Sequence, residues 1–149
     1  MARTQQDFSE VLALFNARGV EYVIVGAHAL AFHGAPPYSG DLGIFLRPDP
    51  DNARRVLDAL QSFGFGSVGL TAADFENPDR VVQLGVPPVR VDIVTSLTGV
   101  SWEEVHARRV SGKYGDVPVD YIGREQFIAN KRASGRDRDL ADVEALGEA

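Results

Sequence analysis

Two aspartates that stand among apolar neighbours are the residues of this chain best suited to chemistry. Asp41 begins the apolar run DLGIFL, and Asp92 is the one acidic residue in VRVDIVTSL. A carboxylate buried without a partner is costly, so each needs one. If the two runs form neighbouring strands, both carboxylates can converge on Mg²⁺, which prefers oxygen ligands and leaves positions for phosphates. Aspartates at strand ends also cap turns or pair with arginine, and spacing alone does not separate these possibilities.

Gly43 stands two residues after Asp41 and therefore on the same face of the expected strand. A glycine inside a strand adds no packing and costs roughly 0.5–1 kcal/mol in chain entropy. A carboxylate at this position would lie beside Asp41. The sequence therefore raises the question of why that side chain is missing.

The apolar period alternates between helix and strand along the chain. Gly19 ends the first helical stripe, and Ser101 with Glu104 forms a capping box for a later helix. Segment 67–78 has no clear period and is expected to be a loop with room for a short helix. The pattern predicts helices over 8–19, 26–34, 48–66, 101–109, 124–134 and 137–147, and strands over 21–26, 41–46, 80–85, 89–97 and 117–123. This mixture favours an α+β fold, a mixed sheet covered by helices mainly on one face.

The composition limits the classes of protein to consider. The chain has 149 residues, of which 44% are hydrophobic, so we expect a single domain over 1–149 with one core. No segment is apolar enough to span a membrane, and MARTQQDFSE lacks the apolar core of a signal peptide. The absence of cysteine excludes disulfides and thiolate metal sites and fits a cytoplasmic protein. A net charge of −6 argues against a surface broadly complementary to nucleic acid.

The segment YVIVGAHAL predicts a strand that ends in glycine and opens a helix. The backbone N–H groups of Gly26 and Ala27 would then be free to bind phosphate at the positive end of the helix dipole. A second candidate is the basic cluster Lys131, Arg132, Arg136 and Arg138. It is either a solvated face paired with nearby aspartates or a site that holds phosphate or an RNA acceptor.

Other residues have simpler explanations. His28 and His33 are five residues apart, so a helix does not place them on one face as a metal pair, and His33 is expected to bond the loop backbone. His106 is expected to be an exposed helix residue. Trp102 is expected to be a core or interface anchor, since no second aromatic residue accompanies it.

Three segments together carry a resemblance to a known family. They are YVIVGAHALAFHGAPPYSGDLGIFL, VDIVTSL and NKRASGRDRDLADVEAL, and they extend from about Tyr22 to Leu146. The chain resembles the small bacterial nucleotidyltransferases of the DNA polymerase β superfamily, close to the AbiEii-like proteins and the minimal nucleotidyltransferase toxins. The resemblance implies the nucleotidyltransferase fold and transfer of NMP from an NTP to a tRNA or protein acceptor. It further implies two Mg²⁺ ions, and a toxin role with an antitoxin protein as partner.

The resemblance assigns roles residue by residue. It implies that Asp41 and Asp92 are catalytic metal ligands, and that the nucleotide-binding residues are Gly26, Ala27, Ser39 and Lys131. Arg138, Asp139 and Asp142 match the family's pattern of a lysine followed by a basic residue and two spaced aspartates. Four positions depart from the family: Gly43 replaces the second metal-binding aspartate, Pro37 replaces an arginine, Ser39 replaces a threonine as a mild change, and Ala27 lacks the usual hydroxyl.

Loss of the ligand at position 43 should reduce metal affinity or activity by at least about 10–100-fold. Gly43 is consistent with natural decay, with a deliberate inactivating change, or with a carboxylate supplied by a partner. The expected function is an impaired nucleotidyltransferase, and the alternative is a non-catalytic protein that binds a nucleotide or a partner. We further expect Gly43→Asp to cost little stability while metal is present.

Overall fold

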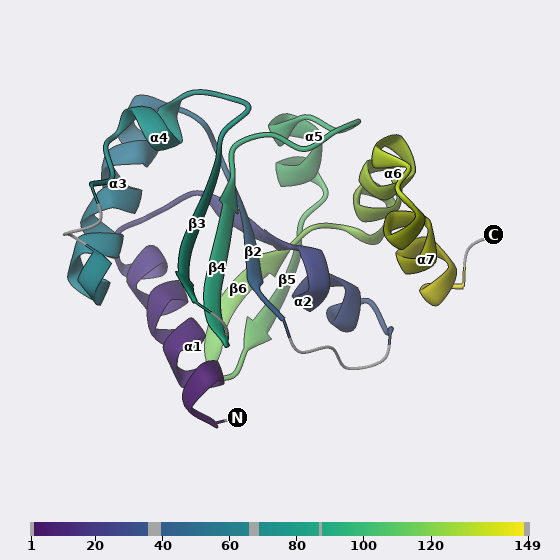
Figure 1. The fold of residues 1–149 in the computed structure, drawn as a ribbon, viewed down its shortest axis with the longest axis horizontal. Helices are drawn as coiled ribbons and strands as arrows, with labels where there is room; N and C mark the ends of the chain where they lie inside the picture. The colour runs from purple at the N-terminus through teal and green to yellow at the C-terminus, as the bar shows by residue number, and fades with distance from the viewer. Residues whose placement is uncertain (1, 36–39, 66–68, 87, 148–149) are drawn as a thin grey trace.

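The computed structural model describes residues 2–35, 40–65, 69–86 and 88–147. Helices and strands alternate irregularly along the chain, as expected for an α+β protein (Figure 1). The elements in chain order are α1 (Ala2–Ala17), β1 (Tyr22–Val25), α2 (Gly26–Phe32), β2 (Leu42–Leu46), α3 (Pro50–Leu60), the helical turn η1 (Gln61–Phe65), α4 (Ala73–Glu76), β3 (Val81–Val86), β4 (Val89–Val94), α5 (Trp102–Ala107), β5 (Val110–Tyr114), β6 (Val117–Tyr121), α6 (Arg124–Ser134) and α7 (Asp137–Ala145).

The strands form one mixed sheet in the order β3-β4-β2-β1-β6-β5. The pairs β2–β4 and β1–β6 are parallel, whereas β1–β2, β3–β4 and β5–β6 are antiparallel. The central strands β1 and β2 supply much of the core, with Ile24 and Ile44 fully buried. The predicted fold class, a mixed sheet covered by helices, is confirmed.

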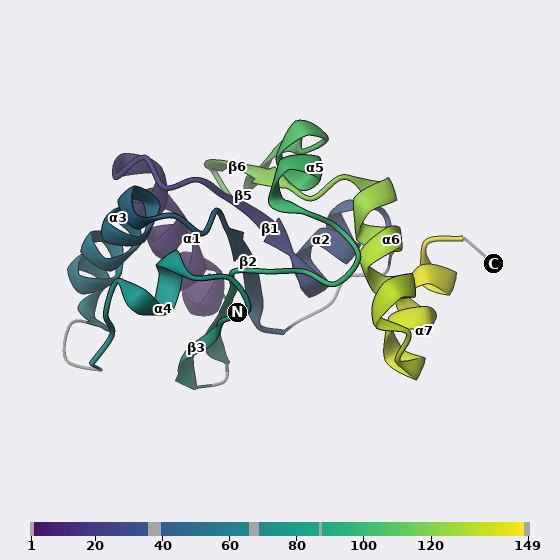
Figure 2. The same cartoon turned by 90° about the horizontal axis from the view of Figure 1, so that it is seen from above.

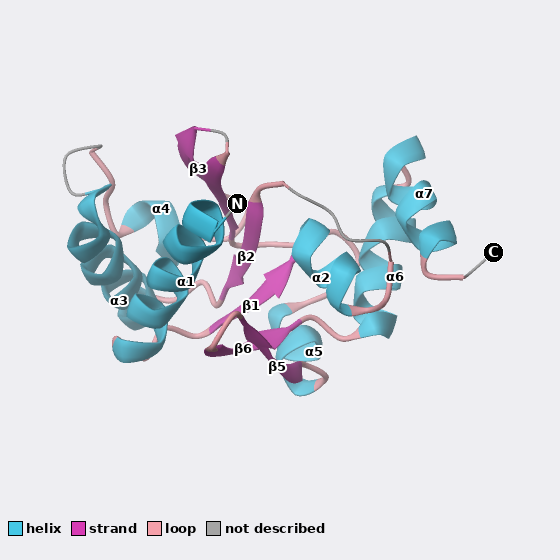
Figure 3. Ribbon diagram, turned by 90° about the horizontal axis from the view of Figure 1, so that it is seen from below, coloured by secondary structure: helices cyan, strands magenta, loops and turns pink. Residues whose placement is uncertain are grey.

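Helices lie on both sides of this sheet (Figures 2 and 3). Helices α1, α3 and α4 lie on one side, and α2, α6 and α7 lie on the other. The expectation that one face would carry most of the helices is therefore wrong. The physical reason is that β1 is buried at four successive positions, a pattern typical of strands covered on both faces.

Asn52 fixes the ends of the two central strands. Its side chain accepts a hydrogen bond from the Glu21 N–H at 2.7 Å and donates to the carbonyls of Glu21 and Arg47, each at 2.9 Å. Asn52 is fully buried in the first turn of α3, whose N-terminus is capped by Asp49. These bonds join the start of β1 to the end of β2. They therefore help to set the register between β1 and β2, the strand that carries Gly43.

The predicted elements are found, and one strand was missed. Helix α4 lies in the segment expected to be a loop with a short helix, and the capping box of Ser101 and Glu104 is present. The missed strand is β5, whose sequence VSGKY is poor in strand-forming residues. Gly112 is required there because a Cβ would lie 2.8 Å from Cε1 of Phe32, a ring that stacks on Tyr121. None of the helices in the described ranges is long and apolar enough to cross a membrane.

Candidate functional site

Asp41 and Asp92 are brought together by the parallel pairing of β2 with β4. Gly43 is the register partner of Asp92, and Asp41 directly precedes β2. The prediction that adjacent strands bring the two aspartates together is confirmed, with Asp41 one residue before β2 and Asp92 within β4. Their carboxylates contact the same atom, Nε of Arg90, at 3.0 Å from Asp41 Oδ2 and 3.3 Å from Asp92 Oδ1. The two acids therefore share one cation.

Arg90 was missed by the sequence analysis. It stands two residues before Asp92 in β4, so side-chain alternation places both on one face of the sheet. The arginine–x–aspartate spacing was the available signal, because on a strand this spacing brings a cation next to a carboxylate. All three side chains are about one third exposed, so solvent and ligands can reach the cluster.

The electrostatics of the cluster are not balanced. Asp41, Asp92 and Arg90 together carry one net negative charge. Burial raises the pKa of Asp92 above its usual range, and the nearby Asp41 carboxylate adds to this effect while Arg90 opposes it. The folded chain therefore holds a carboxylate whose charge would be stabilised by a further cation.

Gly43 lies against the neighbouring strand β1. A Cβ at this position would be 3.0 Å from the carbonyl oxygen of Val25 and 3.3 Å from its Cγ2. Both contacts are tighter than ordinary van der Waals contact, and the closer one involves backbone that cannot rotate away. A side chain at position 43 therefore requires Val25 to shift by a few tenths of an ångström. The expectation that Gly43→Asp costs little stability while metal is present stays a prediction.

A two-ion centre of the kind implied by the resemblance does not fit the described residues. No group of three His, Cys, Asp or Glu side chains within 2–35, 40–65, 69–86 and 88–147 is placed to hold a metal ion. Asp41 and Asp92 supply two carboxylates, Gly43 supplies none, and the guanidinium of Arg90 contacts the oxygens that a metal would use.

Helix α2 begins directly after β1, next to Gly43. Gly26 has φ 71°, and a Cβ built on it would lie 4.0 Å from Cα of Gly43. No side chain caps the helix at Val25, so the first backbone N–H groups, including Gly26 and Ala27, have no side-chain acceptor there. The helix is only seven residues long, which limits its dipole. Ser39 and Pro37 lie outside the described residues.

Lys131 lies in a second cluster, between α6 and α7. Its ammonium nitrogen is 3.3 Å from Asp139 Oδ1 and 3.3 Å from Asp142 Oδ2, and lies over the ring of Phe127. The buried Asp139 carboxylate also accepts from Arg136 Nε at 2.7 Å. The basic cluster is thus at least partly paired with aspartates, and the contacts found for Lys131 among the described residues lie within these two helices.

The remaining histidines and the tryptophan have structural partners. His33 Nε2 lies 2.6 Å from the carbonyl oxygen of Ile122 and so bonds the loop backbone as predicted. The pKa of His28 is lowered by burial. Trp102 is buried against Phe45, as expected for a core anchor, and His106 stacks on it and is only partly exposed.

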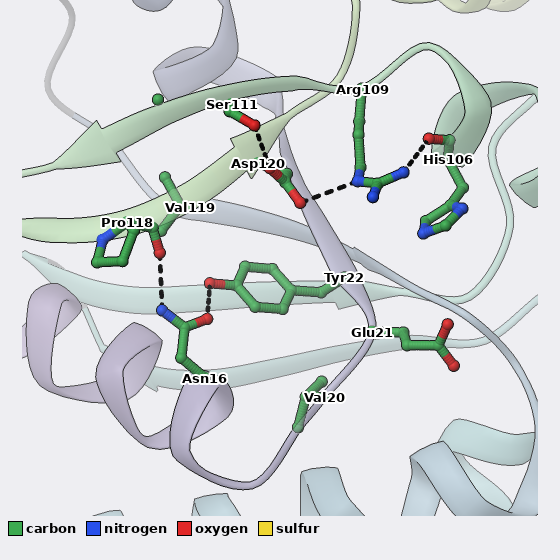
Figure 4. A pocket seen from close by; sticks show the side chains of 11 residues that line it. Asn16, Val20, Glu21, Tyr22, His106, Arg109, Ser111, Pro118, Val119 and Asp120 are labelled. Atoms are coloured by element: carbon green, nitrogen blue, oxygen red, sulfur yellow. Dashed lines mark hydrogen bonds and ion pairs between the residues drawn. The ribbon is translucent and has the colours of Figure 1, made fainter.

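A separate pocket of about 410 Å³ lies near Tyr22, at the end of β1 away from Val25 and Gly43 (Figure 4). Its polar side chains largely satisfy one another. Asp120 accepts from Arg109 Nε at 3.0 Å, and the Tyr22 hydroxyl donates to Asn16 Oδ1 at 2.9 Å. Burial and the charge of Asp120 raise the pKa of Tyr22. Sequence reasoning did not identify this pocket, because its lining comes from five separate segments.

Comparisons with known proteins agree with this architecture. The sequence matches no protein-family model and no curated protein. The structure is similar to a proposed nucleotidyltransferase from Thermotoga maritima, with a TM-score of 0.55 and 12% identity over 92% of this chain and 86% of the other. It is also similar to an antigenic nucleotidyltransferase-like protein from Paracoccidioides brasiliensis, with a TM-score of 0.51 and 15% identity over 96% of this chain and 73% of the other. At these identities the likeness establishes architecture alone, and on that ground this chain has the nucleotidyltransferase fold.

Proposed function

We propose that this chain binds a nucleoside triphosphate on its nucleotidyltransferase fold and is strongly impaired in transferring NMP from it. The observation that carries the proposal is the position of Arg90, whose Nε contacts both Asp41 and Asp92. A second observation supports it: Gly43 is the register partner of Asp92 and has no side chain to bind a metal. Solved structures with this fold are described as nucleotidyltransferases or nucleotidyltransferase-like, which supports an NTP as the ligand.

The residues have separate roles in this proposal. Asp41 and Asp92 would be the protein ligands of a Mg²⁺ ion carried by the NTP phosphates, and Arg90 would have to move away from their oxygens. Arginine binds phosphate oxygens through charge-assisted hydrogen bonds, so the displaced guanidinium has a partner in the triphosphate. Gly26 and Ala27 contribute backbone N–H groups next to Gly43. Ser39 and Lys131 stay predictions as nucleotide contacts.

The acceptor in the proposal is the class implied by the family resemblance, a tRNA or a protein. The same resemblance implies a toxin with an antitoxin partner. An impaired site predicts that expression of the unchanged chain does not slow the growth of a host cell. A variant with a rebuilt site should slow growth if the toxin role is correct.

The test compares the unchanged chain with Arg90→Gln, Gly43→Asp and the double variant. Each is incubated with α-labelled NTP, Mg²⁺ and tRNA or protein acceptors. The double variant should transfer label at least about 100-fold faster than the unchanged chain, because it regains a ligand and loses the competing cation. Asp92→Asn in the double-variant background should abolish the gain.

Mg²⁺ binding gives a readout that does not depend on transfer. In thermal unfolding, millimolar Mg²⁺ should raise the Tm of Arg90→Gln by more than that of the unchanged chain, since ions that bind the native state stabilise it. Asp41→Asn in the Arg90→Gln background should remove the shift. An equal shift in all three proteins would contradict competition between Arg90 and the metal.

A non-catalytic binding protein is the second candidate, and the absence of a third acidic ligand within the described ranges favours it. NTP binding with no transfer in any variant would select this alternative. Transfer by the unchanged chain at the double variant's rate would show that the site is not impaired. Failure of the unchanged chain to bind NTP in calorimetry would show that a nucleotide is not its ligand.

A further inference from the structure

Asp41 lies just outside the strand that follows it. Strand β2 begins at Leu42, and its pairings begin at Leu42 with β4 and at Gly43 with β1. These pairings fix the backbone on the carboxyl side of Asp41. A backbone that is held on one side only does not keep a side chain in one position, because it retains conformational freedom. The amino side of Asp41, at Gly40, therefore needs a partner of its own.

His28 supplies this partner from the first turn of helix α2. Its Nε2 lies 3.4 Å from the carbonyl oxygen of Gly40, and the ring donates this hydrogen bond because a carbonyl can only accept. Two residues earlier, at Gly26, a Cβ would lie 4.0 Å from Cα of Gly43. One helical turn thus approaches the chain on both sides of Asp41. A single bond of this length is weak, so its loss should alter position more than stability.

The ring of His28 is itself held between two aromatic side chains. The centroid of the Phe8 ring of α1 lies 5.8 Å from that of His28, and the centroid of the Tyr114 ring of β5 lies 5.3 Å from it, both edge-on. Burial lowers the pKa of His28, so the ring is neutral at pH 7. A neutral ring carries one proton, and the Gly40 carbonyl selects the tautomer that has it on Nε2.

Packing alone does not require a histidine here. A phenylalanine would fill the space between Phe8 and Tyr114 without the cost of burying a polar nitrogen. The bond to Gly40 is what the nitrogen adds. His33, at the other end of the same helix, makes the same kind of bond to a carbonyl of the loop after β6 and so provides an internal comparison.

We propose that His28 is a positioning residue for Asp41. Its ring N–H holds the carbonyl of Gly40 and so keeps the Asp41 carboxylate in its place. That place is against Arg90, whose Nε lies 3.0 Å from Asp41 Oδ2, and beside Asp92. The effect of His28 on NTP binding rests on the proposed function, whereas its effect on the contact with Arg90 does not.

Three substitutions at position 28 separate the ring from its hydrogen bond. His28→Phe keeps a ring between Phe8 and Tyr114 and loses the N–H. His28→Gln keeps an N–H donor of similar reach and loses the ring, and His28→Ala loses both. His33→Phe is the matched control, because it removes a histidine-to-carbonyl bond from the same helix. Circular dichroism confirms the fold of each variant.

The first readout is the Nε–H signal of Arg90 in proton–nitrogen NMR spectra, identified by its loss in Arg90→Gln. Asp41→Asn gives the position of this signal without the Asp41 charge. The signal should move at least halfway toward that position in His28→Phe and His28→Ala. It should stay in place in His28→Gln and His33→Phe. A role in packing alone predicts the reverse for the first pair of substitutions, with His28→Phe unmoved and His28→Gln moved, and this result would overturn the proposal.

The second readout is the Kd for NTP with Mg²⁺, measured by calorimetry. His28→Phe should raise this Kd by about tenfold, the lower end of the effect of losing a group that orients a ligand. His28→Gln should bind NTP more tightly than His28→Phe does. If the unchanged chain binds no NTP, the proposed function fails, and the Arg90 signal still decides the role of His28. Equal changes of that signal in His28→Phe and His33→Phe would show a general loosening of α2 and overturn the positioning role.

Discussion

Two pairs of aspartates in this molecule each hold a basic side chain, yet the two clusters have opposite electrostatic character. Between α6 and α7, Asp139 and Asp142 hold Lys131, and Arg136 also contacts Asp139, so charges balance. On the sheet, Asp41 and Asp92 share Arg90, and within the described part of the chain no second basic side chain is found with them. The two acids and two basic side chains of the first cluster sum to zero charge. The two acids and one arginine of the second sum to one negative charge.

The pKa values of the two clusters follow this difference. Hydrogen bonds from Arg136 hold the pKa of Asp139 below its usual range, and Lys131 lowers it further, although the carboxylate is buried. Burial raises the pKa of Asp92, and the like charge of Asp41 adds to the effect. A buried carboxylate with sufficient donors is a structural element, whereas a carboxylate short of a cation is suited to bind one.

The largest expected effect is at Asp139. Asp139→Ala should lower the free energy of unfolding by about 3 kcal/mol, because it removes a buried charge and leaves Lys131 without its more buried partner. Urea denaturation measures the change. Asp142→Ala, at a partly exposed member of the same cluster, should cost less than about 1 kcal/mol. Equal losses from the two variants would contradict the distinction between them.

A smaller effect is expected at Gly43, where the sheet cluster lacks its third acid. Gly43→Ala should lower the free energy of unfolding by about 1–2 kcal/mol, because the new methyl group crowds Val25. In a double-mutant cycle, Val25→Ala should relieve part of this cost by removing Cγ2, and the carbonyl contact should retain the rest. Strict additivity of the two changes would show that the contact with the Val25 side chain does not matter.

The smallest expected effect on stability is at Asp92, and its sign is opposite to that at Asp139. A lowered folded pKa means that the charge of Asp139 stabilises the fold above its unfolded pKa, and this contribution is lost as pH falls through the folded pKa. A raised folded pKa means that stability falls as pH rises from the unfolded to the folded pKa of Asp92. At pH 7, Asp92→Asn should therefore be neutral or stabilise by less than about 1 kcal/mol, while Asp139→Asn destabilises. Chemical denaturation at pH 4 and pH 7 tests both signs, and destabilisation by both variants at pH 7 would remove the contrast.

Much of the fold could be predicted because its signals are local. The strand that follows Asp41 and the strand that contains Asp92 were identified from short apolar runs, and α5 from its capping box. Strand β5 was missed because Ser111, Gly112 and Lys113 weaken the local preference for a strand, and its pairing with β6 overrides that preference.

The candidate site was predicted less completely, because its chemistry depends on neighbours across the sheet. Parallel pairing of β2 with β4 was needed to show that Arg90 lies between the two acids. The crowding at Gly43 comes from the backbone of β1, which no side-chain pattern reveals. The position of Lys131 depends on how α7 returns along α6, and the sequence motif alone left that geometry open.

The parallel pairing of β2 with β4 also affects the order in which the chain folds. The hairpins β3–β4 and β5–β6 join strands that are close in sequence, whereas Leu42 and Val91 are register partners far apart along the chain. Non-local pairings form slowly, because loop closure costs entropy before contacts compensate for it. Asp41 and Asp92 therefore meet only after the local hairpins can exist. The repulsion between the two carboxylates therefore arises late in folding. It should raise the unfolding rate more than it lowers the folding rate.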